Sequence, residues 1–337
     1  MPANPLILFD PFPRTEMMVY TPDTAAALAK MGRVVTHFGS RMPDVMVDEL
    51  LPDVSIIVGQ TAMPKDRLDR APNLRGILNV KANWEPNIDY ALAHARGIQV
   101  LSAAPAMAPA VAEYCVAQAI TLARGLHKAD PLFRASGEAY GINGNGDAYS
   151  LFDADVAFVG YGNLGRALAP LLRPFGCRIM VHDPWLSDGY LRAEGVEPVS
   201  LEAALSDPQF LFLLAGVTTD NEGGLNRSRL LSIREDATVI LASRAEIVDF
   251  NAFLALAGAG QFRAAVDVFP EEPVTKDDVM RHTPNVLFSS HLAGGLHPSY
   301  ARIREMMLDD ISQILRGMPP LRMQKADPRL AAKMRSQ

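Results

Sequence analysis

A glycine-rich hexapeptide near the middle of the chain constrains the fold more than any other feature. It lies between the apolar run 156–159 and an amphipathic run over 166–174, and it consists of Gly160, Tyr161, Gly162, Asn163, Leu164 and Gly165. A G-x-G-x-x-G sequence between a strand and a helix is typical of a dinucleotide-binding turn. Its glycines permit the tight turn, the approach of a pyrophosphate and close helix packing. We therefore predict that phosphate binds at the N-terminus of the following helix.

An acidic residue at the expected distance favours one cofactor. Asp183 ends the apolar run 178–182 and stands 18 positions after Gly165 (183 − 165). A carboxylate about 20 positions after the fingerprint accepts hydrogen bonds from the ribose of NAD and repels the 2′-phosphate of NADP. Pro184 and Trp185 add no positive charge that would offset this repulsion. The sequence therefore predicts NAD, with a surface Asp that caps a turn as the alternative.

Charge and composition exclude several other classes of protein. The net charge of −6 gives no electrostatic reason to expect nucleic acid or an acidic membrane as a partner. Cys115 and Cys177 lie in apolar segments and form neither a disulfide framework nor a metal motif, so we expect no metal. The N-terminus does not resemble a signal peptide, and Glu113 and Gln118 interrupt the longest apolar stretch. We expect a cytoplasmic protein.

Two series of alternating strand and helix patterns predict two parallel sheets covered on both faces. The first series has expected strands at 6–9, 34–36, 55–58, 76–79 and 98–101, and the second has them at 156–159, 178–182, 210–214, 238–242, 263–266 and 286–289. A long helix over 108–127 and a loop over 137–150 connect the two series. A last helix over 300–315 is expected to return to the first domain, and the polar segment 325–337 to form a loosely held arm.

Ionisable residues stand at or just beyond the ends of three strands of the second series. They are Arg244, Glu272 and His291, and Asp267 directly follows one of these strands. Ligands bind beyond the carboxyl ends of strands in open α/β sheets, so these side chains can converge although they are distant in sequence.

The order of these motifs resembles the D-isomer-specific 2-hydroxyacid dehydrogenase family. The fingerprint is followed by Ser243-Arg244-Ala245, by the run 267–273, and by His291 with a glycine pair that includes Gly294. The phosphoglycerate dehydrogenase-like branch is the most similar, without its regulatory domain. The resemblance implies two doubly wound parallel-sheet α/β domains, with a Rossmann NAD-binding domain (108–297) inserted into a flavodoxin-like substrate domain (1–107 with 298–337).

The resemblance also implies roles that agree with the chemistry of the side chains. Arg244 would bind the carboxylate of a 2-oxo acid, His291 would exchange a proton with the carbonyl oxygen, and Glu272 would orient the imidazole and raise its pKa. The choice of Glu272 over Glu271 rests on the family register. Each residue also has a structural alternative: an ion pair for Arg244, a solvated turn for Glu272, and a cap or core position for His291. The expected cofactor-binding residues are the six of the fingerprint with Asp183, Thr218, Ser243, Asp267 and Gly294.

The substrate-side loop departs from the family pattern. The family has a glycine-rich loop where this chain has the glycine-free stretch 79–89, in which Lys81, Ala82 and Asn83 are expected to bind substrate together with Arg244. Lys81 would supply a second positive charge, with an exposed loop lysine as the alternative, and Trp84 would enlarge this edge of the pocket. Ala245 stands where the family favours glycine, and the stretch 214–219 lacks a His and a Pro common in the family.

These features predict an NAD-dependent enzyme that interconverts a small anionic 2-oxo acid and a D-2-hydroxy acid. Phosphoglycerate, glyoxylate and hydroxypyruvate are the substrate types that this prediction includes. One alternative is NAD-linked oxidation of another small anion, such as formate or phosphite. The other is a non-catalytic NAD(H)-sensing scaffold of the corepressor type, because fold does not fix function. The resemblance further implies a homodimer formed through the NAD-binding domain.

Overall fold

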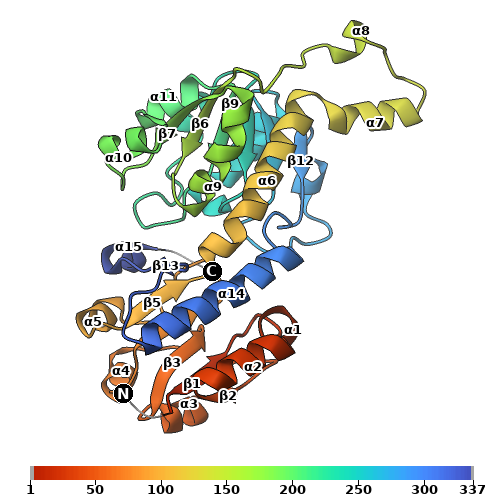
Figure 1. Ribbon diagram of the computed structural model, residues 1–337. Helices are drawn as coiled ribbons and strands as arrows, with labels where there is room; N and C mark the ends of the chain where they lie inside the picture. Colours follow the sequence, from red (N-terminus) through yellow and green to blue (C-terminus); the bar gives the residue numbers. More distant parts are fainter. Residues whose placement is uncertain (1–3, 335–337) are drawn as a thin grey trace. The chain divides into compact units, whose positions relative to one another are not determined.

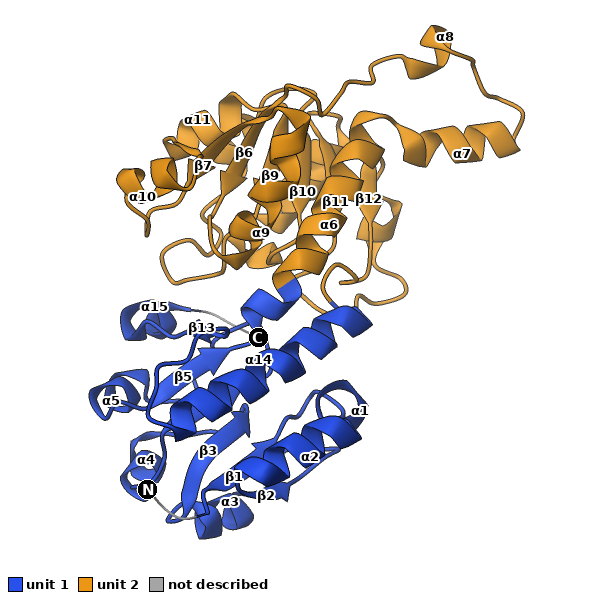
Figure 2. Ribbon diagram, in the orientation of Figure 1, with its two compact units in different colours: residues 1–107, 295–337 blue, residues 108–294 orange. Residues whose placement is uncertain are grey.

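The computed structural model describes residues 4–334 and divides the chain into two compact units. Unit 1 comprises 1–107 with 295–337, and unit 2 comprises 108–294 (Figure 2). We expected the chain to return to the first domain at residue 298. Unit 1 resumes at residue 295, three positions earlier.

Unit 1 contains a six-stranded sheet in the order β13-β5-β4-β3-β1-β2. The order 2-1-3-4-5 of its parallel strands is that of flavodoxin-like folds, and β13 pairs antiparallel with β5 at one edge. The strands are β1 (Leu6–Asp10), β2 (Arg33–Thr36), β3 (Val54–Gly59), β4 (Gly76–Asn79), β5 (Gln99–Ser102) and β13 (Gln324–Lys325).

Successive strand side chains point to opposite sides of this sheet, and helices cover both faces. One face packs against α3 (Asp44–Leu50), α4 (Lys65–Asp69), α5 (Tyr90–Ala95) and α15 (Pro328–Lys333). The other packs against α1 (Glu16–Val19), α2 (Pro22–Met31) and α14 (His297–Leu315). The predicted loose arm over 325–337 is wrong for residues 325–333, since β13 and α15 pack on this unit; residues 335–337 lie outside the described part.

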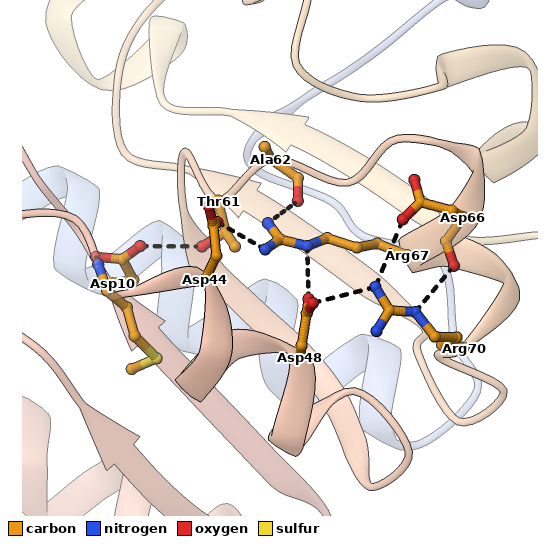
Figure 3. Close-up of polar contacts among 9 residues, drawn as sticks. Asp10, Asp44, Asp48, Thr61, Ala62, Asp66, Arg67 and Arg70 are labelled. Atoms are coloured by element: carbon orange, nitrogen blue, oxygen red, sulfur yellow. Dashed lines mark hydrogen bonds and ion pairs between the residues drawn. The ribbon is translucent and has the colours of Figure 1, made fainter.

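A buried arginine joins two of these helices (Figure 3). Arg67 of α4 donates to Asp48 at 2.8 Å and to Asp44 at 2.6 Å, both on α3, and its third bond goes to the carbonyl of Ala62 at 3.0 Å. The guanidinium is therefore paired and hydrogen-bonded, as a buried charge must be. We interpret this cluster as structural.

Unit 2 contains a seven-stranded parallel sheet in the order β12-β11-β10-β9-β6-β7-β8. Read from β8, the order 3-2-1-4-5-6 is that of a dinucleotide-binding sheet, extended by one strand. The six predicted strands are present, and β8 is an edge strand that we did not predict. The strands are β6 (Asp155–Val159), β7 (Arg178–His182), β8 (Glu197–Pro198), β9 (Phe210–Leu213), β10 (Thr238–Leu241), β11 (Arg263–Val266) and β12 (Val286–Phe288).

Helices also cover both faces of the sheet of unit 2 (Figure 1). One face packs against α6 (Ala104–Ala123), α9 (Asn163–Leu172) and α10 (Asp188–Ala193). The other packs against α11 (Leu201–Ser206), α12 (Arg227–Leu231) and α13 (Phe250–Gly258). By length and composition α6 is apolar enough to cross a membrane, but more than half of its apolar window is buried, as in a core helix. Beyond α6, α7 (Leu126–Arg134) and α8 (Ile142–Asn145) project away from the sheet of unit 2 (Figure 1).

Candidate active site

The glycine fingerprint forms the turn from β6 into α9. Gly160 has φ +98°, and a Cβ there would lie 2.7 Å from the backbone of Ala215, so only glycine fits. A Cβ on Gly165 would lie 2.9 Å from the Tyr161 ring, whereas no atom lies within 4 Å of the position at Gly162. Gly162 is the N-cap of α9 and has no side chain to cap it. The turn therefore fits a pyrophosphate at a helix N-terminus, where backbone N–H groups attract anions.

Two side chains of the predicted fingerprint contacts pack into unit 2, that of Tyr161 fully and that of Leu164 in part. The Tyr161 side chain is 1% exposed and stacks on Phe158, with ring centroids 6.4 Å apart. Leu164 packs against the core of unit 2. A side chain that contacts a cofactor should be accessible in the cofactor-free chain. We therefore expect Tyr161 to contribute only its backbone.

Asp183 is held beside the fingerprint by two backbone bonds. Its carboxylate accepts from Tyr161 N at 2.8 Å and from Trp185 N at 2.9 Å. An ionised carboxylate has about four acceptor positions, so two remain for hydroxyl groups. The negative charge is thus fixed next to the glycine-rich turn.

Arg244 follows β10 in extended backbone, with φ −149° and ψ 138°. Burial lowers the pKa of its guanidinium, and the nearby carboxylates of Glu246 and Glu272 oppose this shift. Its Nη1 donates to the carbonyl of Ser243 at 2.7 Å. Ala245 begins a short 3-10 helix and is not among the residues with positive φ, so it replaces the family's glycine without strain.

His291 and Glu272 form a hydrogen-bonded pair in the segments that follow β12 and β11. Nδ1 of His291 lies 2.7 Å from Oε2 of Glu272, and Oε1 of the same carboxylate accepts from Phe269 N at 3.0 Å. Glu272, rather than Glu271, therefore orients the ring and leaves Nε2 for another partner. The His291 side chain is 49% exposed, so Nε2 is open to a ligand from solvent. His291 has φ +54°, a conformation uncommon for residues other than glycine.

The carboxylate of Asp267, a predicted cofactor contact, is hydrogen-bonded inside the protein. Asp267 is 1% exposed, and its carboxylate accepts from Ser289 Oγ at 2.5 Å, Leu292 N at 2.9 Å and Ala293 N at 3.0 Å. These bonds use most of its acceptor capacity inside the protein. We interpret Asp267 as a structural residue of the loop that carries His291.

Two more predicted cofactor side chains have internal partners. Thr218 is 4% exposed and its hydroxyl donates to Asn221 at 3.1 Å, while Ser243 is 5% exposed and donates to the carbonyl of Leu213 at 2.9 Å. The hydroxyl protons of Thr218 and Ser243 are therefore used inside the protein, and their backbone groups stay available as the predicted cofactor contacts. Gly294 is partly exposed at the end of the His291 loop.

The substrate-side candidates follow β4 in unit 1. Nζ of Lys81 lies 2.7 Å from Glu85, and Arg41 approaches the other oxygen of Glu85 at 3.3 Å. Ala82 and Asn83 are partly exposed beside Lys81. The expectation that Trp84 enlarges the pocket edge is wrong, because Trp84 is 3% exposed and packs edge-on against Tyr90. Arg41 was not among the predicted substrate-side residues, since no sequence motif surrounds it.

Comparisons with known proteins agree with this geometry. The family model described as "D-isomer specific 2-hydroxyacid dehydrogenase, NAD binding domain" matches residues 116–293, more than half of the chain. A glyoxylate reductase of Korarchaeum cryptofilum is 27% identical over 82% of this chain and 84% of its own length. D-3-phosphoglycerate dehydrogenase 3 of Arabidopsis thaliana is 25% identical, over 86% of this chain and 49% of its own length. The crystal structure of a phosphoglycerate oxidoreductase from Rhizobium etli is 36% identical with a TM-score of 0.85, and covers 96% of this chain and 99% of that one.

Proposed function

The chain belongs to the D-isomer-specific 2-hydroxyacid dehydrogenase family, and we propose that it interconverts a 2-oxo acid and a D-2-hydroxy acid with NAD(H). The His291–Glu272 pair at 2.7 Å carries this proposal, because it supplies an oriented proton donor in the unit that binds the cofactor. The order of the strands and the fingerprint turn support the same conclusion.

The side chains of unit 2 supply positioning and proton transfer. When bound, the nicotinamide supplies hydride to the keto carbon. Nε2 of His291 gives a proton to the carbonyl oxygen in reduction and takes it back in oxidation, so one hydride and one proton are transferred in each direction. The carboxylate of Glu272 stabilises the imidazolium through Nδ1. The fork of Arg244 binds the substrate carboxylate and polarises the adjacent carbonyl.

We assign NAD rather than NADP on the position of Asp183. Its carboxylate is fixed beside the phosphate-binding turn by Tyr161 N and Trp185 N. A 2′-phosphate there would meet like charge, whereas ribose hydroxyls would donate to the two remaining acceptor positions.

A panel assay tests the proposal. The protein is mixed with NADH or NADPH and with glyoxylate, hydroxypyruvate, phosphohydroxypyruvate and larger 2-oxo acids, and the loss of NADH absorbance is followed. We expect turnover with at least one acid and a preference for NADH. Binding of NADH without turnover of any acid would favour the sensing scaffold, and turnover only with formate or phosphite and NAD would favour the other alternative.

On the substrate side we propose that Lys81, Ala82 and Asn83 line the site, with Lys81 binding an anionic group of the substrate. We expect Lys81→Ala to lower kcat/KM for the preferred acid about tenfold to a hundredfold, the scale of a hydrogen bond to a charged group. Lys65→Ala is a matched control, because Lys65 forms the same i,i+4 pair with Asp69 at 2.6 Å on α4. Steady-state kinetics on both variants provide the comparison. An unchanged kcat/KM in Lys81→Ala removes Lys81 from the site.

We also propose that two copies of the chain associate through the projecting segment 126–142 of unit 2. No residue of α7 is buried, and the segment exposes large apolar side chains that an isolated surface would keep in water. They are Leu126, Leu132, Phe133, Tyr140 and Ile142, each more than half exposed. A second copy of this chain fits because the family resemblance implies a dimer formed through this unit.

Substituting the apolar side chains of this segment should separate the copies. We expect Leu132→Asp/Phe133→Asp to weaken dimerisation about 30-fold or more, the effect of losing an interface hot spot. Sedimentation velocity over a range of concentrations measures the change. Val45→Asp, at a valine of α3 that is 70% exposed, is the control and should leave the mass unchanged. A monomeric wild-type chain at all concentrations contradicts the proposal.

A further inference from the structure

We propose that Tyr114 and Ser289 are positioning residues, which act through buried Asp267 to hold His291 in its working conformation. This inference rests on the function proposed above. All four residues belong to unit 2, and Tyr114 is supplied by α6. None of the motifs in the sequence pointed to Tyr114 or Ser289.

The three side chains form a hydrogen-bonded chain with a fixed direction. Ser289 Oγ donates to Asp267 Oδ1 at 2.5 Å, and Tyr114 Oη lies 2.5 Å from the same Ser289 Oγ. A serine hydroxyl has one proton, so Tyr114 must be the donor in the second bond. Burial raises the pKa of Tyr114 to about 12, in agreement with a phenol that acts as the donor.

Asp267 in turn holds the backbone around His291. Its carboxylate accepts from the N–H groups of Leu292 and Ala293, and its backbone carbonyl accepts from the N–H of His291 at 2.9 Å. Three successive N–H groups of the loop therefore end on one buried residue. This arrangement explains how His291 keeps φ +54°, since an unfavourable conformation persists only where its surroundings fix it.

The hydrogen bonds from Tyr114 through Ser289 to Asp267 thus connect α6 to the loop that sets the orientation of the His291 imidazole. Glu272 fixes the ring from the side of Nδ1, and the Asp267 bonds fix the backbone that carries it. Tyr114→Phe does not alter His291 or Glu272 themselves, but it removes the donor that orients Ser289. Small misplacements of a reacting group lower the rate of the chemical step more than they weaken binding.

The test compares Tyr114→Phe, Ser289→Ala and the double variant. We expect kcat to fall about twofold to tenfold in Tyr114→Phe and about tenfold or more in Ser289→Ala, the scale of one and of two lost hydrogen bonds. The Kd for NADH should stay within about twofold of wild type, since neither residue belongs to the glycine-rich turn at 160–165. Because both residues act through one series of hydrogen bonds, the kcat of the double variant should equal that of Ser289→Ala alone.

Tyr149→Phe is the matched control. Tyr149 is another partly buried phenol of unit 2, and its Oη lies 2.5 Å from the hydroxyl of Thr238, outside the His291 loop. We expect this variant to lower the melting temperature as Tyr114→Phe does and to leave kcat unchanged. If Tyr114→Phe behaves like Tyr149→Phe, or if the effects of Tyr114→Phe and Ser289→Ala add, the positioning role is overturned.

A second readout does not require turnover. The downfield imidazole Nδ1 proton of His291, assigned by its loss in His291→Asn, reports the bond to Glu272 in an NMR spectrum. We expect this signal to shift in Tyr114→Phe and Ser289→Ala and to stay in place in Tyr149→Phe. A shift in an inactive protein would support the positioning network and contradict the proposed reaction, whereas unmoved signals with normal turnover would contradict the network alone.

Discussion

Replacing His291 by alanine is expected to lower kcat by about 10²–10⁴, the usual contribution of a general acid–base group. The proton that balances hydride transfer would then have to come from water. The Kd for NADH should change little, because the phosphate-binding turn at Gly160–Gly165 and Asp183 lie on other strands of the sheet. Steady-state kinetics and NADH fluorescence titration measure the two effects separately.

The backbone at His291 calls for a second variant. Its φ of +54° is unfavourable for alanine, whereas asparagine adopts this conformation more readily. His291→Asn should therefore fold and show the same loss of kcat. His297→Asn is the control, because His297 is an exposed histidine at the start of α14. A collapse of NADH affinity with nearly normal kcat in either His291 variant would show that His291 is not the proton donor.

The second large effect is expected at Arg244. Arg244→Lys keeps a positive charge but loses the planar fork that binds a carboxylate with two hydrogen bonds. We expect kcat/KM for the 2-oxo acid to fall about 10²–10³, the scale of removing an electrostatic stabiliser from an active site. Burial strengthens this expectation, since the same desolvation that lowers the pKa of Arg244 would act on a lysine whose ordinary pKa is only about 10.4.

The control for this prediction is Arg234→Lys, at an exposed arginine of unit 2 that is hydrogen-bonded to the carbonyl of Asp207. It should retain wild-type kinetics. A variant Arg244→Lys with unchanged kcat/KM and a lowered melting temperature would assign Arg244 to an ion pair with Glu246, the structural alternative.

The sequence predicted most of the fold because long apolar runs alternate with helical patterns. The fingerprint then located the first strand of the cofactor-binding sheet, and the order of strands in both sheets agrees with the expected fold class. The two strands that we missed, β8 and β13, have two residues each, too few to show any periodicity. The helix α7 was not predicted as a separate element, because the expected long helix over 108–127 includes only its first two residues and no element was expected over 128–134.

The sequence indicated which residues matter at the site but not which of them are buried. Arg244, Glu272 and His291 stood out because strand ends of one sheet meet at one edge. Asp267 stood out for the same reason, yet it faces inward and serves the His291 loop. A strand end exposes some side chains and buries others, and only the packing decides between them. Ser289 carries no signal of its own.

The most direct test of the proposed reaction follows the hydrogen atom itself. The protein is incubated with the preferred 2-oxo acid and NADH that carries deuterium at the transferred C4 position, and the product is examined by mass spectrometry and chiral chromatography. We expect one deuterium at C2 of a D-2-hydroxy acid, with formation slowed about 10²–10⁴-fold in His291→Asn. A product without deuterium, an L-2-hydroxy acid, or no product with any acid of the panel would contradict the proposal.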